Sequence, residues 1–198
     1  MIGIVDYGAG NLRSVANALG HVHADFRVCD AGKDLQTVDK VLLPGVGHFA
    51  AAVEHLTRTG LMQALREWRR QEKPILGICL GLQLLFEGSE EAPKAPGLGL
   101  LAGRVVQLQA RRVPHMGWNE VAVAAACPLA DEGDCDYYYF AHSYVAAPAA
   151  ASLVTGTTNL DGLLIPAIVG NDRLWGVQLH PEKSGAAGLR LLARFARC

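Results

Sequence analysis

Apolar and polar residues alternate in a regular way along the first 86 residues. Short apolar runs, typical of strands covered on both faces of a sheet, are separated by longer segments whose apolar residues recur at helical spacing. In the last of these segments Leu61, Leu65 and Trp68 share one side. The runs cover residues 2–6, 24–29, 40–43 and 75–78, and the amphipathic segments cover residues 12–19, 49–58 and 61–71. This alternation predicts a parallel sheet with helices on both faces.

The pattern changes after residue 99. A loop at 87–99, rich in proline, glycine and acidic residues, is followed by short apolar runs with no amphipathic helix between them. The runs cover residues 105–108, 121–123, 137–145, 153–158, 163–169 and 174–179, with a second loop at 111–119 and a closing helix at 186–196. Dense strands without helices favour antiparallel pairing. We therefore expect an α/β fold, a mostly parallel sheet flanked by helices with antiparallel strands added in the C-terminal half.

Composition places the chain among globular proteins. Hydrophobic residues make up 51% of the 198 residues and charged residues 19%, and the length predicts a single domain over residues 1–198. The net charge of -1 gives no indication of nucleic acid or an anionic membrane as a partner. No apolar run is long enough to span a bilayer, and the N-terminal residues are typical of a first strand rather than a signal peptide.

The cysteines and glycines exclude several kinds of site. The five cysteines are odd in number and form no C-x-x-C pair, which argues against a disulfide framework or a structural zinc site. Gly8 and Gly10 follow the first strand, but Arg13 stands where a dinucleotide-binding turn needs a third glycine, so we expect a tight turn. The chain is expected to be cytoplasmic and to need no metal or cofactor.

Cys79 lies at the junction between the strand at 75–78 and the helix that begins at Leu80. Gly77 and Gly81 flank it at the spacing of a nucleophile elbow, where a sharp strand-to-helix turn requires neighbours without a Cβ. A helix N-terminus also favours a thiolate. Because most free cysteines are simply small buried residues, a nucleophilic role for Cys79 depends on a base and an orienting group elsewhere in the chain.

His180 is the favoured base among the seven histidines. It ends the apolar run 174–179, and Pro181 biases it toward extended geometry, in which residues two apart point the same way. Glu182 is then placed to orient and charge-stabilise the imidazole, as in a catalytic triad. A histidine at a strand end beside a solvated glutamate would give the same sequence. His142 is a competing base, but it has no carboxylate close in sequence.

A glycine-rich turn, Gly45-Val46-Gly47, follows the third predicted strand. Such a turn can direct backbone N–H groups at an anion, or it can be a plain loop. The carboxyl ends of parallel strands meet at one edge of a sheet. We therefore expect this turn and Cys79 to open on the same edge.

Two stretches carry a family resemblance. Residues 77–83, Gly-Ile-Cys-Leu-Gly-Leu-Gln, and residues 177–182, Val-Gln-Leu-His-Pro-Glu, resemble the class I, or triad, glutamine amidotransferases. Further stretches resemble one subgroup of that family, the glutaminase subunits of imidazole glycerol phosphate synthases. These stretches are residues 6–11, 44–49, 114–119, 138–144 and 180–184. The resemblance spans the whole chain in order and departs at Leu82, where methionine is commoner in the family.

The resemblance implies a mechanism. The Cys79 thiolate attacks the side-chain amide of glutamine, His180 passes the thiol proton to the leaving ammonia, and Glu182 holds the imidazole. Water activated by His180 then releases glutamate from the thioester. The implied oxyanion donors are the backbone of Gly45, Val46, Gly47 and Leu80, and the residues implied around the amino-acid end of glutamine are Gln83, Ser143 and Tyr144.

The resemblance also implies a partner, a separate cyclase subunit with a (β/α)₈ barrel. It receives the ammonia and produces imidazole glycerol phosphate and an aminoimidazole carboxamide ribotide in histidine biosynthesis. Asn11, Tyr138 and Lys183 lie in stretches that resemble the partner-facing surface, although each could be an ordinary surface residue.

The residues alone leave two other classes of protein open. A stand-alone cysteine hydrolase of γ-glutamyl amide or peptide bonds would need neither a partner surface nor the stretch 114–119. A catalytically silent scaffold would not need Cys79, His180 and Glu182 together.

Overall fold

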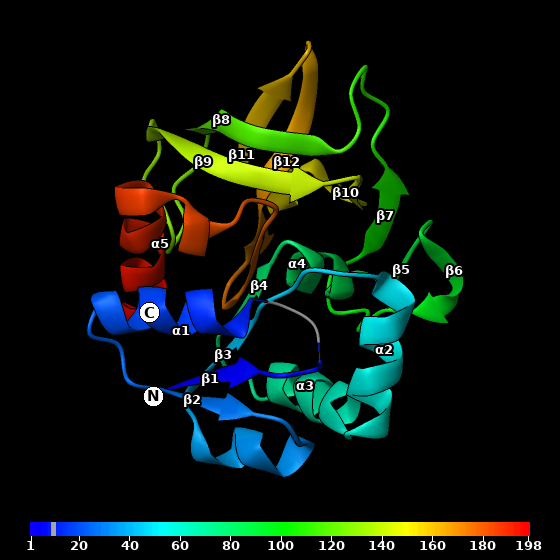
Figure 1. Cartoon of the computed structure of the whole chain (residues 1–198), viewed down its shortest axis with the longest axis vertical. Helices are drawn as coiled ribbons and strands as arrows, with labels where there is room; N and C mark the ends of the chain where they lie inside the picture. The colour runs from blue at the N-terminus through cyan, green and yellow to red at the C-terminus, as the bar shows by residue number, and fades with distance from the viewer. Residues whose placement is uncertain (9–10) are drawn as a thin grey trace.

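The computed structural model describes residues 1–8 and 11–198 and contains two sheets with helices packed around them (Figure 1). Gly10, the second glycine of the predicted tight turn, lies outside the described residues. The large sheet has the strand order β2-β1-β3-β4-β13-β12-β11-β8-β9. Its strands are β1 (Ile2–Val5), β2 (Phe26–Cys29), β3 (Lys40–Leu43), β4 (Ile75–Ile78), β8 (His115–Val123), β9 (Cys135–His142), β11 (Val154–Leu160), β12 (Leu163–Asn171) and β13 (Leu174–Val177).

The large sheet has a parallel half and an antiparallel half. Strands β2, β1, β3, β4 and β13 run parallel to one another. From β13 onward, each pairing through β12, β11, β8 and β9 is antiparallel. The predicted fold class is therefore confirmed: β8, β9, β11 and β12, all after residue 99, form the antiparallel half, and β13 returns to the parallel half.

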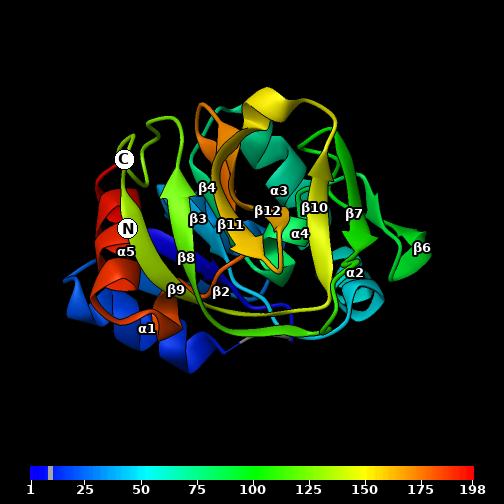
Figure 2. The same cartoon turned by 90° about the horizontal axis from the view of Figure 1, so that it is seen from above.

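Helices cover both faces of the parallel half, α1 and α5 on one side and α2 and α3 on the other (Figures 1 and 2). In β3, Leu42 packs in the core under α1 and α5, whereas Val41 and Leu43 pack in the core under α2 and α3. This explains the continuous apolar runs of β1, β3 and β4, whose two faces are buried, whereas the edge strand β2 exposes Arg27 and Val28. The helices are α1 (Leu12–His21), α2 (Phe49–Arg58), α3 (Leu61–Arg70), α4 (Leu80–Leu84) and α5 (Gly185–Arg197), with 3-10 turns η1 (Gly32–Thr37), η2 (Ala151–Leu153) and η3 (Pro181–Lys183). No helix in the described ranges combines the length and the apolar character needed to cross a membrane.

The structure corrects three predictions about the middle of the chain. The expected loop 87–99 contains two short strands, and the expected loop 111–119 becomes strand β8 from His115 onward. The expected single strand 137–145 divides at Ser143, because β9 belongs to the large sheet and β10 to a separate small sheet of order β10-β7-β5-β6. The small sheet consists of β5 (Gly88–Ser89), β6 (Ala92–Pro96), β7 (Gly103–Gln107) and β10 (Tyr144–Pro148).

These errors have local causes. β6 carries two prolines and lies at the edge of the small sheet, where proline is tolerated although it gives no strand signal. β8 exposes Met116 and Trp118, so its apolar residues do not report which face is buried. Nothing in the apolar run across Ser143 marks the change of sheet.

Candidate active site

The backbone around Cys79 forms the sharp turn that the glycine spacing predicts. Cys79 lies between β4 and α4 with φ +52° and ψ −106°, a conformation that is strained for a residue with a side chain. A Cβ on Gly81 would overlap the carbonyl oxygen of Leu43, and a Cβ on Gly77 would lie 2.6 Å from the carbonyl oxygen of Gly81. Both glycines are therefore required by close backbone contacts.

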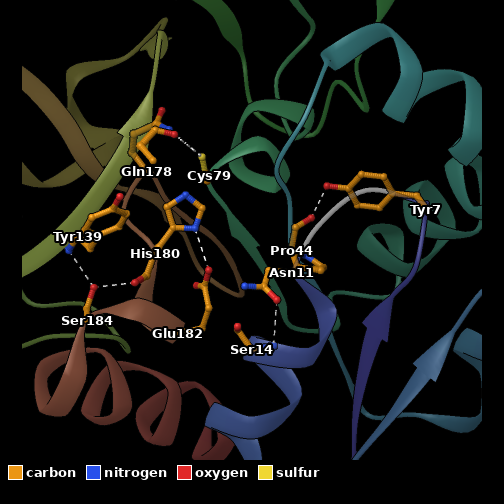
Figure 3. A network of polar contacts seen from close by, with 11 residues as sticks. Tyr7, Asn11, Ser14, Pro44, Cys79, Tyr139, Gln178, His180, Glu182 and Ser184 are labelled. Carbon is orange, nitrogen blue, oxygen red and sulfur yellow. Dashed lines mark hydrogen bonds and ion pairs between the residues drawn. The ribbon is translucent and has the colours of Figure 1, made fainter. Parts of the chain in front are cut away.

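His180 and Glu182 meet beside Cys79. His180 Nδ1 lies 2.9 Å from Glu182 Oε1, and the two side chains are 1% and 3% exposed. Figure 3 shows the His180 ring between Cys79 and Glu182. The predicted contact is present, and His180 itself is extended as predicted, with φ −105° and ψ +93°. The chain does not stay extended, however: Pro181 opens the 3-10 turn η3, and this turn brings Glu182 under the ring.

The protonation of His180 is governed by its two neighbours. Burial alone lowers its pKa, but Cys79 and the Glu182 carboxylate more than offset that effect and raise the pKa of His180 to about 9. Its surroundings therefore favour the protonated ring. A cationic imidazole facing a cysteine sulfur stabilises a thiolate and can act as a general acid toward a leaving group.

Gln178 and Ser184 are site residues that the sequence analysis missed. Gln178 is completely buried, and its Nε2 donates to Cys79 Sγ at 3.7 Å. Ser184 Oγ donates to the His180 carbonyl at 2.6 Å and accepts from the Tyr139 N–H at 3.0 Å, which anchors His180 to β9 (Figure 3). A glutamine inside the apolar run 174–179 was the available signal, because a buried amide needs a partner.

The expected contribution of a helix dipole at Cys79 is small. α4 has only five residues, so few peptide dipoles align behind the sulfur. Gln178 Nε2 and the His180 ring are the polar side-chain groups beside Cys79, and its Sγ also lies 3.9 Å from the Ala141 carbonyl oxygen.

A pocket of about 210 Å³ opens beside Cys79. Seven predicted site residues line it, namely Val46, Gly47, Cys79, Leu80, Gln83, Ser143 and Tyr144. The turn after β3 and the elbow after β4 thus open on the same sheet edge, as expected. The positive φ of this turn falls on Gly47, at +111°. Gly45 is buried behind the pocket wall, where a Cβ would overlap the Tyr7 hydroxyl and press on Leu80.

Glu91 also lines the pocket and was missed by the sequence analysis. It follows β5, and its Oε2 accepts from the Phe49 N–H at 2.7 Å at the start of α2. The loop-like composition of 87–99 concealed it, since only the β5–β6 hairpin returns this carboxylate to the pocket. A carboxylate at this place can accept from a cationic group of a ligand.

The predicted partner-facing residues have different surroundings. Asn11 is exposed and caps α1, where its side chain accepts from the Ser14 N–H at 3.3 Å. Lys183 is exposed, with Nζ 5.6 Å from the centre of the Tyr139 ring. Tyr138 is only 6% exposed, and burial, followed by the charge of Asp136, raises its pKa to about 12. Its prediction as a partner-facing residue is therefore wrong, because strand alternation turns Tyr138 into the core and Tyr139 toward Lys183.

Comparisons with known proteins cover almost the whole chain. The family model of glutamine amidotransferase class-I matches residues 3–197. A protein of Desulfitobacterium hafniense named imidazole glycerol phosphate synthase subunit HisH is 46% identical, covering 100% of this chain and 94% of that protein. A protein of the same name from Synechococcus sp. is 44% identical, covering 98% and 92%.

Solved structures share the fold at lower identity. A crystal structure of a glutamine amidotransferase matches with a TM-score of 0.80 and 18% identity, covering 100% of this chain and 99% of the other. The structure of PurLQS from Thermotoga maritima matches with a TM-score of 0.76 and 20% identity, covering 99% and 97%.

Proposed function

Because this chain belongs to the class I glutamine amidotransferase family, we propose that it is the glutaminase subunit of an imidazole glycerol phosphate synthase and acts in histidine biosynthesis. The observation that carries the proposal is the His180–Glu182 contact next to Cys79, whose side chain lines the 210 Å³ pocket (Figure 3). Identities of 44% and 46% over nearly the full length support the subgroup.

The proposed reaction begins from a thiolate and a protonated His180. The Cys79 sulfur attacks the side-chain amide carbon of glutamine, and a C–S bond forms while the carbonyl oxygen becomes an oxyanion. His180 gives its proton to the amide nitrogen, the C–N bond breaks, and ammonia leaves. Neutral His180 then takes a proton from water as the water attacks the thioester, which releases glutamate and restores the thiolate. Glu182 keeps the imidazole oriented and stabilises its charge.

The pocket offers contacts for both ends of the substrate. Val46, Gly47 and Leu80 line it close to Cys79, and we assign their backbone N–H groups to the oxyanion. Gly45 serves by letting the turn pack closely on Leu80. Gln83, Ser143 and Tyr144 are assigned to the amino-acid end of glutamine, and the Glu91 carboxylate to its ammonium group.

The partner and the compartment follow from the same proposal. The ammonia is passed to a cyclase subunit with a (β/α)₈ barrel, with which this chain forms a heterodimer as a single domain over residues 1–198. The family match over residues 3–197 supports one domain. Asn11 and Lys183 are proposed to face the partner. The five free cysteines favour the reducing cytoplasm.

Glutamate release from glutamine tests this function. The wild type and Cys79→Ala are assayed alone and with a cyclase subunit and its nucleotide substrate, with Cys135→Ala as the control at an exposed cysteine. We expect strong activity in the loaded complex that Cys79→Ala abolishes and Cys135→Ala retains. Equal activity with and without the partner would indicate a stand-alone hydrolase, and no activity in either state would indicate a scaffold.

A further inference from the structure

Two buried histidines, His115 and His142, form a pair beside the pocket that the proposed reaction does not use. His115 Nδ1 lies 3.0 Å from His142 Nε2, and His142 Nδ1 lies 3.0 Å from the carbonyl oxygen of Tyr144. The two residues are 4% and 5% exposed. They are directly opposite each other in the β8–β9 register, and His115 also stacks on Phe140 at 4.7 Å between ring centres.

The contacts determine which nitrogen of each ring carries the proton. A carbonyl oxygen only accepts, so the proton that points at Tyr144 is on His142 Nδ1. His142 Nε2 is then the acceptor, and His115 Nδ1 is its donor. His115 Nε2 carries no proton in this arrangement, and it has no hydrogen-bond partner among the described residues. Donation therefore runs in one direction, from His115 through His142 to Tyr144.

Burial keeps both rings neutral. Burial lowers the pKa of His115, and it also lowers that of His142, to about 3, with further lowering from His115 and His180. The positive charge near this part of the site thus stays on His180. A neutral His142 preserves the directional chain, because a protonated ring would turn its Nε2 acceptor into a donor facing His115.

The Tyr144 carbonyl oxygen joins these hydrogen bonds to α4, the helix that follows Cys79. The same oxygen accepts from Gln83 Nε2, on α4, at 3.0 Å. Ser143 and Tyr144 lie where the polypeptide leaves the large sheet for the small one, because Ser143 follows the last residue of β9 and Tyr144 is the first residue of β10. Pairing with β7, including the Leu108 N–H to Ser143 carbonyl bond at 2.9 Å, holds their other side. The Gln83 contact therefore ties this wall to α4, and the His142 contact, from two residues earlier in the same segment, fixes the direction of the Tyr144 carbonyl.

We infer that His142, held in its Nδ1–H form by His115, is a positioning residue for the amino-acid end of glutamine. It acts through the Tyr144 carbonyl, which places Ser143 and Tyr144 opposite Gln83 across the mouth of the pocket. This inference rests on the proposed function, because those three residues are the proposed contacts of glutamine. It assigns His142 to substrate affinity and leaves the chemistry at Cys79 to His180 and Glu182.

Alkylation of Cys79 by iodoacetamide separates these two roles in the full chain. The alkylation rate without glutamine reports the reactivity of the Cys79 sulfur. The glutamine concentration that halves this rate reports the affinity for glutamine. Modification of Cys79 is followed by mass spectrometry of its peptide. His142→Leu removes the donor to Tyr144, whereas His142→Asn keeps an N–H close to the position of Nδ1. His21→Leu is the matched control, because His21 is exposed on α1.

In His142→Leu we expect the glutamine concentration that halves the alkylation rate to rise about tenfold, the effect of one lost hydrogen bond. The alkylation rate without glutamine should stay within about twofold of the wild type. His142→Asn should recover most of the affinity, and His21→Leu should change nothing. Unchanged protection in His142→Leu, or an equal fall in the unprotected rate, would overturn the inference. A wild type that glutamine does not protect would instead overturn the proposed function, and the inference with it.

Nitrogen-15 NMR of histidine-labelled wild-type chain tests the proton positions without any variant. We expect His142 and His115 both to be neutral and protonated at Nδ1 near neutral pH. An Nε2–H form of His142 would overturn the inference even where His142→Leu fails to fold.

Discussion

The two walls of the pocket are held in place by different forces. The wall that carries Cys79 belongs to the parallel half, where backbone packs on backbone so closely that Gly77 and Gly81 leave no room for a Cβ. The opposite wall, at Ser143 and Tyr144, is held by two side-chain hydrogen bonds to the Tyr144 carbonyl, one from Gln83 on α4 and one from His142 in the same segment. The first wall should tolerate no added atom, whereas the second should tolerate a replacement that keeps the donor.

The largest expected effect is that of replacing Glu182, which separates chemistry from packing in the wall that carries Cys79, the nucleophile wall. Glu182→Gln keeps the shape of the side chain but removes the charge that holds the His180 ring, so we expect kcat to fall on the order of 10³-fold or more. Far-UV circular dichroism should change little. Glu54→Gln, at an exposed position on α2, is the control. Activity within about tenfold of the wild type would contradict a triad role for Glu182.

Gly81→Ala disturbs the close backbone packing of the same wall. The added methyl group overlaps the Leu43 carbonyl, and we expect a loss of about 3 kcal/mol or more in the free energy of unfolding, measured in urea. Gly20→Ala is the matched helical control, because a Cβ there meets nothing within 4 Å and should be neutral or stabilising by up to about 1 kcal/mol. Equal stability of the two variants would show that the elbow can relax.

Gln178→Met tests the buried donor to the nucleophile. Methionine preserves the length of the side chain but cannot donate to Cys79 Sγ, which Gln178 Nε2 approaches at 3.7 Å. We expect the rate of Cys79 alkylation by iodoacetamide to fall about tenfold, in proportion to one weak hydrogen bond to a charged sulfur. Gln109→Met, at a position away from the pocket lining, should leave the rate unchanged. A rate equal to the wild type would assign thiolate stabilisation to His180 alone.

The free energy of unfolding should also depend on pH through one histidine beside each wall, His142 on the acid side and His180 on the alkaline side. The pKa of His142 is lowered to about 3, so below about pH 6.5 the unfolded chain binds a proton that the folded chain does not. Stability therefore falls as the pH falls, by up to about 1.4 kcal/mol per pH unit. The pKa of His180 is raised to about 9, so its contribution is complete below about pH 6.5 and is lost as the pH rises through 9.

Urea unfolding of the wild type and His142→Asn between about pH 6.5 and pH 4.5 checks the acid side, where the variant should have the shallower slope. Glu182→Gln, measured from about pH 6.5 to pH 9.5, should flatten only the alkaline side. Parallel pH profiles for all three proteins would mean that neither histidine has a shifted pKa in the folded state.

Much of the nucleophile wall was predictable because its signals are local. The elbow spacing of Gly77 and Gly81 and the Pro181 turn act within a few residues of the groups they place. Even there the prediction had the wrong reason at Glu182, since a 3-10 turn differs from an extended chain in ways that His-Pro-Glu alone does not report. The turn Gly45–Gly47 met Cys79 because parallel strands end at a common edge.

Residues on the opposite wall depend on which segments pair across the sheets. Glu91 reaches the pocket only through the β5–β6 hairpin, and Tyr138 rather than Tyr139 enters the core because of the register of β9 against β8. The His115–His142 contact joins residues 27 positions apart in the chain. The hydrophobic periodicity of these segments does not predict these contacts.

Hydrophobic periodicity and short spacings were enough to predict the fold class, the nucleophile elbow and the His180–Glu182 pair, because they act through steric limits on neighbouring residues. The pairing of buried polar groups became visible in the folded domain alone: Gln178 with Cys79, His115 with His142, and His142 and Gln83 with one carbonyl oxygen. The physical reason is that a buried hydrogen bond requires its two partners within about 3 Å in a defined direction. Strand register and helix packing across the whole domain set that distance, and local sequence does not.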